Sequence, residues 1–224
     1  MSPFYGLCRS FFSIFAVLVV VAFLGRVEPI MAASGVPAGH VTRLVGSAVV
    51  GEDGAVGRAA ASGLPVRVGN SIVTGADARL ELQLQDGSRV TLGADTRFRI
   101  DEYTYAPRRN LGRAVFELVK GVFRATSGAI TRLRAPLFEV HTSYATLGIR
   151  GTDFWGGFHF GNDLDVVLLR GHGVYVRNES GSVELTRVGA GTTVTGPTGV
   201  PKSPHPWSSA KLDAAKASVA WPVR

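Results

Sequence analysis

The clearest pattern along the chain is a strict alternation of apolar and polar side chains between residues 78 and 93. Leucine occupies every second position from residue 80 to residue 84, so these side chains share one face of a strand. Asp86-Gly87 follows, a pair typical of tight hairpin turns, and apolar residues return at positions 90 and 92. The pattern predicts a β-hairpin with a buried leucine face.

The same two-residue period recurs through most of the chain, interrupted by turns that contain glycine. Further segments with strand character are residues 40–50, 64–75, 95–100, 114–128, 133–147, 165–178 and 183–195. Gly46, Gly121 and Gly173 each stand directly ahead of an alternating segment, and glycine permits backbone turns that other residues disfavour. We predict an all-β domain over residues 40–195, a roll or sandwich of short, mostly antiparallel strands with glycine-rich corners.

The N-terminal segment has a different pattern. Arg9 precedes an apolar run at residues 11–24, and small residues follow at 32–34. This is the order of a secretory signal peptide, and the run is shorter than the ~20 residues that a transmembrane helix needs. We predict a signal peptide at residues 1–33 and a periplasmic or secreted protein. The alternative is an uncleaved anchor, which would be the protein's contact with a membrane.

Residues 196–224 are predicted to form a proline-rich tail with a short C-terminal helix. Ser208 or Ser209 is suited to cap a helix over about residues 210–219. The apolar residues expected to pack on the β core are Leu212, Ala215 and Val219, with the flanking Trp207 and Trp221.

Charge and cysteine content narrow the possible functions. The formal net charge is +7, and removal of residues 1–33 (two arginines and one glutamate) leaves +7 − 1 = +6. An excess of this size favours anionic partners. The basic residues are scattered rather than clustered, however, so we predict no nucleic-acid partner. Cys8 is the single cysteine, which excludes an intrachain disulfide and a cysteine-based zinc site.

The strongest candidate for ligand binding is Arg150, in the stretch Gly148-Ile149-Arg150-Gly151-Thr152. Two glycines interrupt the strand rhythm there and predict a bulge or bend, in which Gly148 and Gly151 serve as turn residues. The five donors of a guanidinium could pin neighbouring carbonyls at the bend, or they could anchor a ligand. The further candidate contacts on this stretch are Thr152, Phe154 and Trp155.

A second candidate segment joins Tyr103 and Tyr105 to Arg108 and Arg109 in an apparent loop. Such a loop could bind phosphate or sugar through stacking and charge, or it could be a solvated connection. The remaining turn residues of interest are Gly75, Asp86 and Gly87.

Catalytic and metal-binding signatures are absent from the sequence. There is no Gly-x-Ser-x-Gly elbow, no Ser-x-x-Lys and no phosphate-loop lysine. The residues that could meet across strands as a mixed nitrogen and oxygen metal site are His159, Asp163, Asp165 and His172. Their turn and strand-edge positions explain them without a metal. We therefore predict no catalytic residue, no metal and no cofactor.

Several segments together resemble the FecR domain, a periplasmic module named after the ferric-citrate regulator. The segments, in family order, are residues 64–75, the Asp-Gly-Ser turn at 86–88, residues 114–128, and Gly148 to Thr152 followed by Phe154. The sequence departs from the family pattern at Asn70, where aspartate is usual, and at Ser143, where proline is usual. The resemblance covers residues 40–195 and implies a non-enzymatic envelope module for ligand or partner recognition and signalling.

We do not expect this chain to have the sigma-factor control of full-length family members. Full-length regulators of the family carry a cytoplasmic segment that controls a sigma factor, and the few residues before the apolar run lead us to expect no such segment here. The alternative function is a structural envelope protein whose basic surface binds an anionic cell-wall or outer-membrane polymer. The expected partner is thus an envelope protein, still unidentified, or an anionic polymer.

Overall fold

The computed structural model describes residues 35–53 and 56–222. The predicted signal peptide at residues 1–33 therefore lies outside the described residues. Within the described part of the chain, no helix is both long and apolar enough to cross a membrane.

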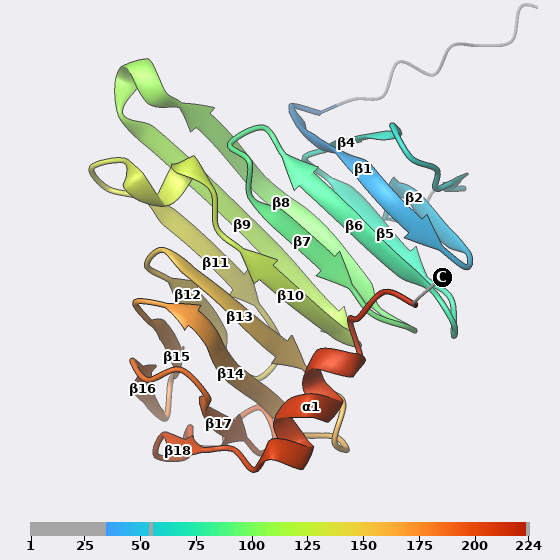
Figure 1. Ribbon diagram of the computed structural model, residues 1–224. Helices are drawn as coiled ribbons and strands as arrows, with labels where there is room; N and C mark the ends of the chain where they lie inside the picture. Colours follow the sequence, from blue (N-terminus) through green and yellow to red (C-terminus); the bar gives the residue numbers. More distant parts are fainter. Residues whose placement is uncertain (1–34, 54–55, 223–224) are drawn as a thin grey trace, which may run out of the picture. The chain divides into compact units, whose positions relative to one another are not determined.

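The described strands form two sheets of nine strands each, which lie face to face as two layers (Figure 1). The first sheet has the order β18-β17-β14-β13-β10-β7-β6-β1-β4. Its strands are β1 (Pro37–Val45), β4 (Pro65–Arg67), β6 (Arg79–Leu84), β7 (Arg89–Leu92), β10 (Val122–Thr126), β13 (Thr152–Gly157), β14 (Leu164–Gly171), β17 (Ala190–Val194) and β18 (His205–Pro206).

The second sheet has the order β16-β15-β12-β11-β9-β8-β5-β2-β3. Its strands are β2 (Ala48–Glu52), β3 (Arg58–Ala59), β5 (Asn70–Thr74), β8 (Arg97–Ala106), β9 (Leu111–Lys120), β11 (Leu137–His141), β12 (Thr146–Ile149), β15 (Val174–Asn178) and β16 (Gly181–Leu185). Two short 3-10 helices, η1 (Pro107–Arg109) and η2 (Ala129–Arg132), connect strands.

The strand pairing confirms the predicted all-β fold of mostly antiparallel strands. The predicted hairpin is β6 and β7, in which Leu80 pairs with Leu92 and Leu82 with Val90. Among the described strands, one neighbouring pair, β9 and β11, is parallel. Parallel neighbours cannot be joined by a tight hairpin, and here the connection passes through β10 of the other sheet and then η2.

The core lies between the two layers and contains a chain of phenylalanine rings. Phe98 stacks on Phe116 at 5.3 Å within the second sheet and lies 5.9 Å from Phe123 of the first sheet. Phe123 in turn contacts the edge of Phe154 at 5.2 Å. All four side chains are fully buried, so the aromatic contacts join the two sheets directly.

The chain passes from one sheet to the other at corners, and several of these corners depend on glycine. Gly46, Gly121 and Gly173 each occupy a passage between sheets, as their positions ahead of alternating segments suggested. Gly121 has a φ of 86°, and an added Cβ would lie 2.5 Å from the Cα of Thr96. A side chain at that corner would therefore be both strained and sterically blocked.

The C-terminal helix α1 (Ser209–Ala217) covers the outer face of the first sheet. The Oγ atom of Ser208 caps it by accepting the backbone N–H of Lys211 at 3.3 Å. A second, smaller apolar cluster fills the space beneath the helix, and its members are Val122, Trp155, Val167, Trp207, Ala215 and Val219, with Leu169 and Leu212 at its margin. The predicted helix and its apolar face are confirmed, and this face packs on the outside of the sandwich.

Candidate functional site

Arg150 lies at a corner where the chain passes from β12 in the second sheet to β13 in the first. A second corner, between β14 and β15, makes the return passage at His172 and lies beside it. The backbone N–H of Arg150 donates to the carbonyl of Gly173 at 3.2 Å, and the N–H of His172 donates to the carbonyl of Gly151 at 3.4 Å. The two corners therefore form one unit at the rim of the sandwich.

Thr152 holds this unit together from the inside. Its hydroxyl donates to the carbonyl of Gly173 at 2.9 Å and accepts the N–H of Gly173 at 3.2 Å. Its own backbone N–H donates to the Oγ atom of Ser127, at the end of β10, at 2.9 Å. Thr152 is buried, so these bonds are shielded from water and fix the relative position of the corners.

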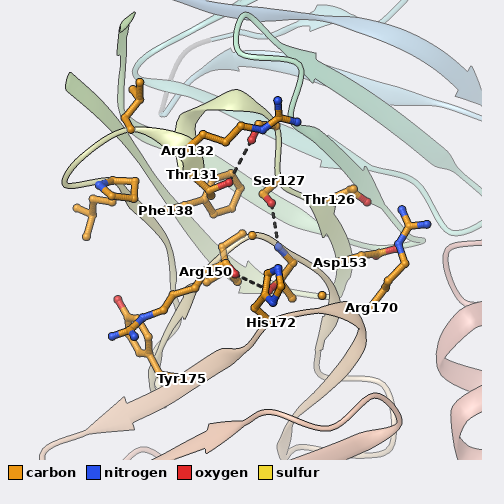
Figure 2. Close-up of a pocket in the computed structure, with 18 residues that line it drawn as sticks. Thr126, Ser127, Thr131, Arg132, Phe138, Arg150, Asp153, Arg170, His172 and Tyr175 are labelled. Carbon is orange, nitrogen blue, oxygen red and sulfur yellow. Dashed lines mark hydrogen bonds between the residues drawn. The ribbon is translucent and has the colours of Figure 1, made fainter. Parts of the chain in front are cut away.

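A pocket of about 870 Å³ opens beside the paired corners (Figure 2). Its lining comes from β10, η2, β11, the end of β12, the start of β13, the end of β14 and the start of β15. Leu137, Phe138 and Ile149 form an apolar part of the wall. The basic side chains that line it are Arg132, Arg150, Arg170 and His172. We call this cavity the rim pocket.

The rim pocket has an excess of unpaired positive charge. Asp153 is its single lining carboxylate, and the guanidinium of Arg124 holds it by two hydrogen bonds, at 2.8 and 2.7 Å. The hydrogen bonds to Asp153 raise the pKa of Arg124 above its usual range, as expected for a closely matched ion pair. Arg132, Arg150 and Arg170 have no acidic partner within the described residues.

The other two candidates from the Arg150 stretch lie away from the rim pocket. Phe154 faces the core between the sheets. Trp155 faces the opposite way, beneath α1, and its Nε1 donates to the Oγ atom of Ser218 at 2.9 Å. Both side chains are fully buried, so of the four predicted contacts the structure brings Arg150 and Thr152 to the pocket.

The second candidate segment is not a loop, in contrast to the prediction. Tyr103 and Tyr105 belong to β8, and Arg108 and Arg109 lie exposed in η1 at the tip of the long β8–β9 hairpin. The hairpin pairs through to Ala106, so the strand continues further than the alternation indicated. None of these four residues lines the rim pocket, so the two predicted sets of contacts do not form one site.

The predicted turn residues fall into two groups. Gly75, Asp86, Gly87 and Gly151 occupy turns or corners, and Gly87 and Gly151 have positive φ values of 82° and 68°. Gly148 instead lies within β12, and the bend begins two residues later.

Gly148 is needed for a close approach rather than for a turn. The ring of Tyr175, from the neighbouring strand β15, lies over it, and an added Cβ would be only 1.8 Å from the ring's Cζ. Tyr175 crosses Gly148 to donate its hydroxyl to Glu139. Burial and then this hydrogen bond to Glu139 raise the pKa of Tyr175 to about 12.

The residues considered for a metal site have different surroundings in the structure. His172 lines the rim pocket, whereas His159 lies against Trp155 and Asp165 is buried in contact with Lys211. Among the described residues, no group of three or more His, Cys, Asp or Glu side chains could hold a metal ion.

A comparison with known protein families matches the part of the chain that contains both corners. Residues 70–173 match the family described as FecR protein. The chain carries a FecR domain. The match lies within the segment of residues 40–195 that the sequence motifs indicated and spans slightly under half of the chain.

Two crystal structures, at 2.50 and 1.65 Å resolution, are similar to this chain; both are of a protein from Parabacteroides distasonis ATCC 8503 described as "a putative anti-sigma factor". Each has 19% identity and a TM-score of 0.52, and the alignment covers 64% of this chain and 62% of that one. The chain thus spans less than two thirds of that structure, and at this identity the likeness concerns the fold alone. A search of curated proteins found no match.

The FecR domain contains most of the rim pocket. It begins at the first residue of β5 and ends at Gly173, so both corners and all of the basic lining residues fall inside it. Tyr175 and the covering helix α1 lie beyond its end.

Sequence reasoning missed Arg132 and Arg170 as members of this site. A signal for Arg170 was present, because Arg170-Gly171 repeats the Arg150-Gly151 pair at the neighbouring corner. Arg132 had no comparable signal. It lies in η2, within the connection from β10 to β11, and only the folded connection brings it to the pocket.

Proposed function

We propose that this FecR-domain protein is an exported, non-enzymatic recognition module that takes part in signalling at the cell envelope and binds its ligand or partner at the rim pocket. The observation that carries the proposal is the free guanidinium of Arg150 at the mouth of that pocket. Its side chain has no hydrogen bond or ion pair within the described residues. An arginine whose side chain makes no hydrogen bond or ion pair to its own corner is available for an external partner.

The sequence left open whether Arg150 pins a turn or anchors a ligand, and the geometry favours the second role. Thr152 and the backbone bonds between Gly151 and His172 already hold the corner. The backbone of Arg150 takes part through its N–H, whereas its side chain is exposed and lines the pocket. Replacement of the side chain should thus affect binding far more than folding.

Location outside the cytoplasm is the second part of the proposal. It rests on the order of Arg9, the apolar run at residues 11–24 and the small residues at 32–34. A fusion of the full chain to alkaline phosphatase tests it, because that enzyme becomes active only after export. Activity that equals a fusion lacking residues 1–33 contradicts the proposed location.

The binding role is tested in intact cells by a photoreactive amino acid at position 150. The matched control is position 200, where Val200 is 63% exposed and packs near Gly181, at the opposite end of β15 and β16. We expect cross-links to an envelope component from position 150 and none from position 200. Equal labelling from both positions, or none from position 150, contradicts a binding role for the rim pocket.

The second candidate is a structural protein that holds an anionic envelope polymer. It is favoured by the exposed Arg89, which lies in the same row of the first sheet as Thr126, Asp153 and Arg170 and extends the positive charge across the sheet. Polymer binding of this kind weakens steeply with salt, and substitution of Arg89 weakens it as much as substitution of Arg150. Recognition at the pocket predicts that only the Arg150 substitution matters.

A further inference from the structure

We propose that the rim pocket binds a small amphipathic ligand that carries a carboxylate or phosphate group, with the anionic group at Arg150 and the apolar part against the wall between the sheets. This inference rests on the proposed binding role of the pocket and names the chemistry of its ligand. It concerns a bound small molecule rather than a protein surface.

The first argument is charge. Three arginines and His172 line the cavity, and Asp153 is the single opposing carboxylate. Asp153 is 5% exposed, and Arg124 occupies both of its oxygens. The arginine charges in the pocket therefore lack a counter-charge from the described chain, and an anion is the ligand that supplies one.

The second argument is the geometry of the donors. A guanidinium presents paired N–H groups that match the two oxygens of a carboxylate or phosphate. Arg150 and Arg170 each stand immediately before a corner glycine, and Figure 2 shows Arg132 and Arg170 on different sides of the cavity from Arg150. This arrangement surrounds a ligand and accommodates an anionic group at more than one side.

The third argument is the apolar wall. Phe138 and Ile149 form its buried part, and Leu133 and Leu137 are half-buried at its edge. A volume of about 870 Å³ is within the ~300–1,000 Å³ typical of sites for small molecules. Leu133 and Leu137 are partly exposed there, and an inorganic anion alone would leave their apolar surface in contact with water, so a ligand with an apolar part fits better.

The fourth argument is rigidity. The bonds from Thr152 to Gly173 and Ser127 are made without any ligand, so the paired corners are preformed. A preformed site loses little conformational entropy on binding and can hold a small ligand with useful affinity.

The proposal is tested by calorimetric titration of the exported form with ligands that share one eight-carbon tail. Octanoate and octyl phosphate carry the two anionic groups, octyl glucoside is neutral, and octyltrimethylammonium is cationic. Inorganic phosphate provides the anion without a tail. We expect octanoate or octyl phosphate to bind at least tenfold more tightly than the other three. The one that binds more tightly shows whether the anionic group of the ligand is a carboxylate or a phosphate.

Arg150→Gln and Arg170→Gln should each weaken binding of the preferred anion by roughly tenfold to a hundredfold, the range for one charge-assisted hydrogen-bonded pair. Arg58→Gln is the matched control, because Arg58 is an exposed arginine on the distant edge strand β3. Shortening the tail from eight carbons to four should weaken binding, by up to about fourfold per methylene. Unchanged urea midpoints for the variants separate loss of binding from loss of folding.

Three outcomes overturn the inference: anionic and cationic probes of equal affinity, an Arg150→Gln variant that binds as the parent does, or tight binding of a long polyanion with no binding of octanoate and octyl phosphate. Cross-links from position 150 in cells combined with any of these results would retain the proposed function and reject only the ligand class. Loss of both the cross-links and the anion binding rejects both proposals.

Discussion

The hydroxyl of Tyr103 donates a hydrogen bond to Oδ1 of Asp86 at 3.0 Å and accepts one from the backbone N–H of the same residue at 2.9 Å. Asp86 also accepts the Ser88 hydroxyl at 2.6 Å and the backbone N–H of Ile130 at 3.1 Å. The turn between β6 and β7 is thus tied to β8 in the other sheet and to η2. Asp86 is a buried junction, in addition to being a turn residue.

Tyr103→Phe should lower the free energy of unfolding by about 1–3 kcal/mol, because it leaves the backbone N–H of Asp86 without a partner and leaves Oδ1 of Asp86 with the Ser88 N–H, at 3.3 Å, as its remaining donor. Tyr105→Phe is the control, since the Tyr105 hydroxyl has no hydrogen bond within the described residues; we expect a change within about 0.5 kcal/mol. Urea unfolding followed by tryptophan fluorescence measures both. Equal effects from the two substitutions would show that the hydrogen bonds between Tyr103 and Asp86 contribute nothing to the free energy of unfolding.

Gly148→Ala should destabilise the fold by about 1–3 kcal/mol, because the new Cβ displaces the Tyr175 ring and breaks its hydrogen bond to Glu139. The test is a double-mutant cycle with Tyr175→Ala. Once the ring is gone, alanine at position 148 should be neutral or stabilising by about 0.5–1 kcal/mol, as is usual for glycine replacement within a strand. A Gly148→Ala effect that persists in the Tyr175→Ala background would mean that another contact requires the glycine.

Glu139 should give the fold a specific dependence on acid pH. Burial acts to raise its pKa, but hydrogen bonds from His141 and Tyr175 and the charges of His141 and Arg177 outweigh this, so the pKa lies below its ordinary value of 4.5. The folded chain therefore holds a proton at Glu139 less readily than the unfolded chain does. The stabilisation is complete above pH 4.5 and is lost as pH falls from there through the folded-state pKa.

We expect Glu139→Gln to reduce the free energy of unfolding by about 1–3 kcal/mol at neutral pH, with a difference from the parent that narrows steadily below pH 4.5. Urea unfolding at a series of pH values measures this. The control is Glu184→Gln, at an exposed position on the edge strand β16 of the same sheet, for which we expect a change within about 0.5 kcal/mol at neutral pH. A gap between Glu139→Gln and the parent that widens in acid contradicts the lowered pKa.

The alternation of side chains was sufficient to predict most of the strands, the β6–β7 hairpin and the all-β class, whereas the second half of β8 was wrongly expected to be a loop. The alternation did not separate Phe154 from Trp155, which were both candidate contacts, although neighbours in a strand point in opposite directions. It could not show that the outer face is covered, because α1 lies more than fifty residues further along the chain. The burial of Trp155 is therefore a tertiary effect without a local signal.

The candidate site was only partly predictable for the same physical reason. Arg150 stands out because two glycines flank it within a strand pattern. Its neighbours Arg132 and Arg170 come together with it only through the passages between sheets, and the parallel pairing of β9 and β11 leaves no local trace. Likewise, the Tyr103 and Asp86 pair joins residues from two sheets that have no sequence relationship.

The attachment of α1 should depend on one partly buried ion pair, between Lys211 and Asp165. Nζ of Lys211 lies 2.7 Å from Oδ1 of Asp165, 4.2 Å from the ring centre of Trp207 and 5.0 Å from that of Phe160. The Asp165 side chain is 3% exposed, and its other partner is the hydroxyl of Thr193 at 2.6 Å. Without the ammonium group, the carboxylate would be a buried charge held by one neutral donor, which is strongly unfavourable.

Lys211→Met should therefore lower the free energy of unfolding by about 1–3 kcal/mol, whereas Lys216→Met, on the exposed side of α1, should change it by less than about 0.5 kcal/mol. The double variant Lys211→Met with Asp165→Asn should recover most of the loss, because asparagine is uncharged and still accepts the Thr193 hydrogen bond. Urea unfolding followed by tryptophan fluorescence reports this directly, since Trp155 and Trp207 lie beneath the helix. A double variant as unstable as the single one would place the stabilisation in the contacts of Lys211 with the aromatic rings rather than in its charge pairing.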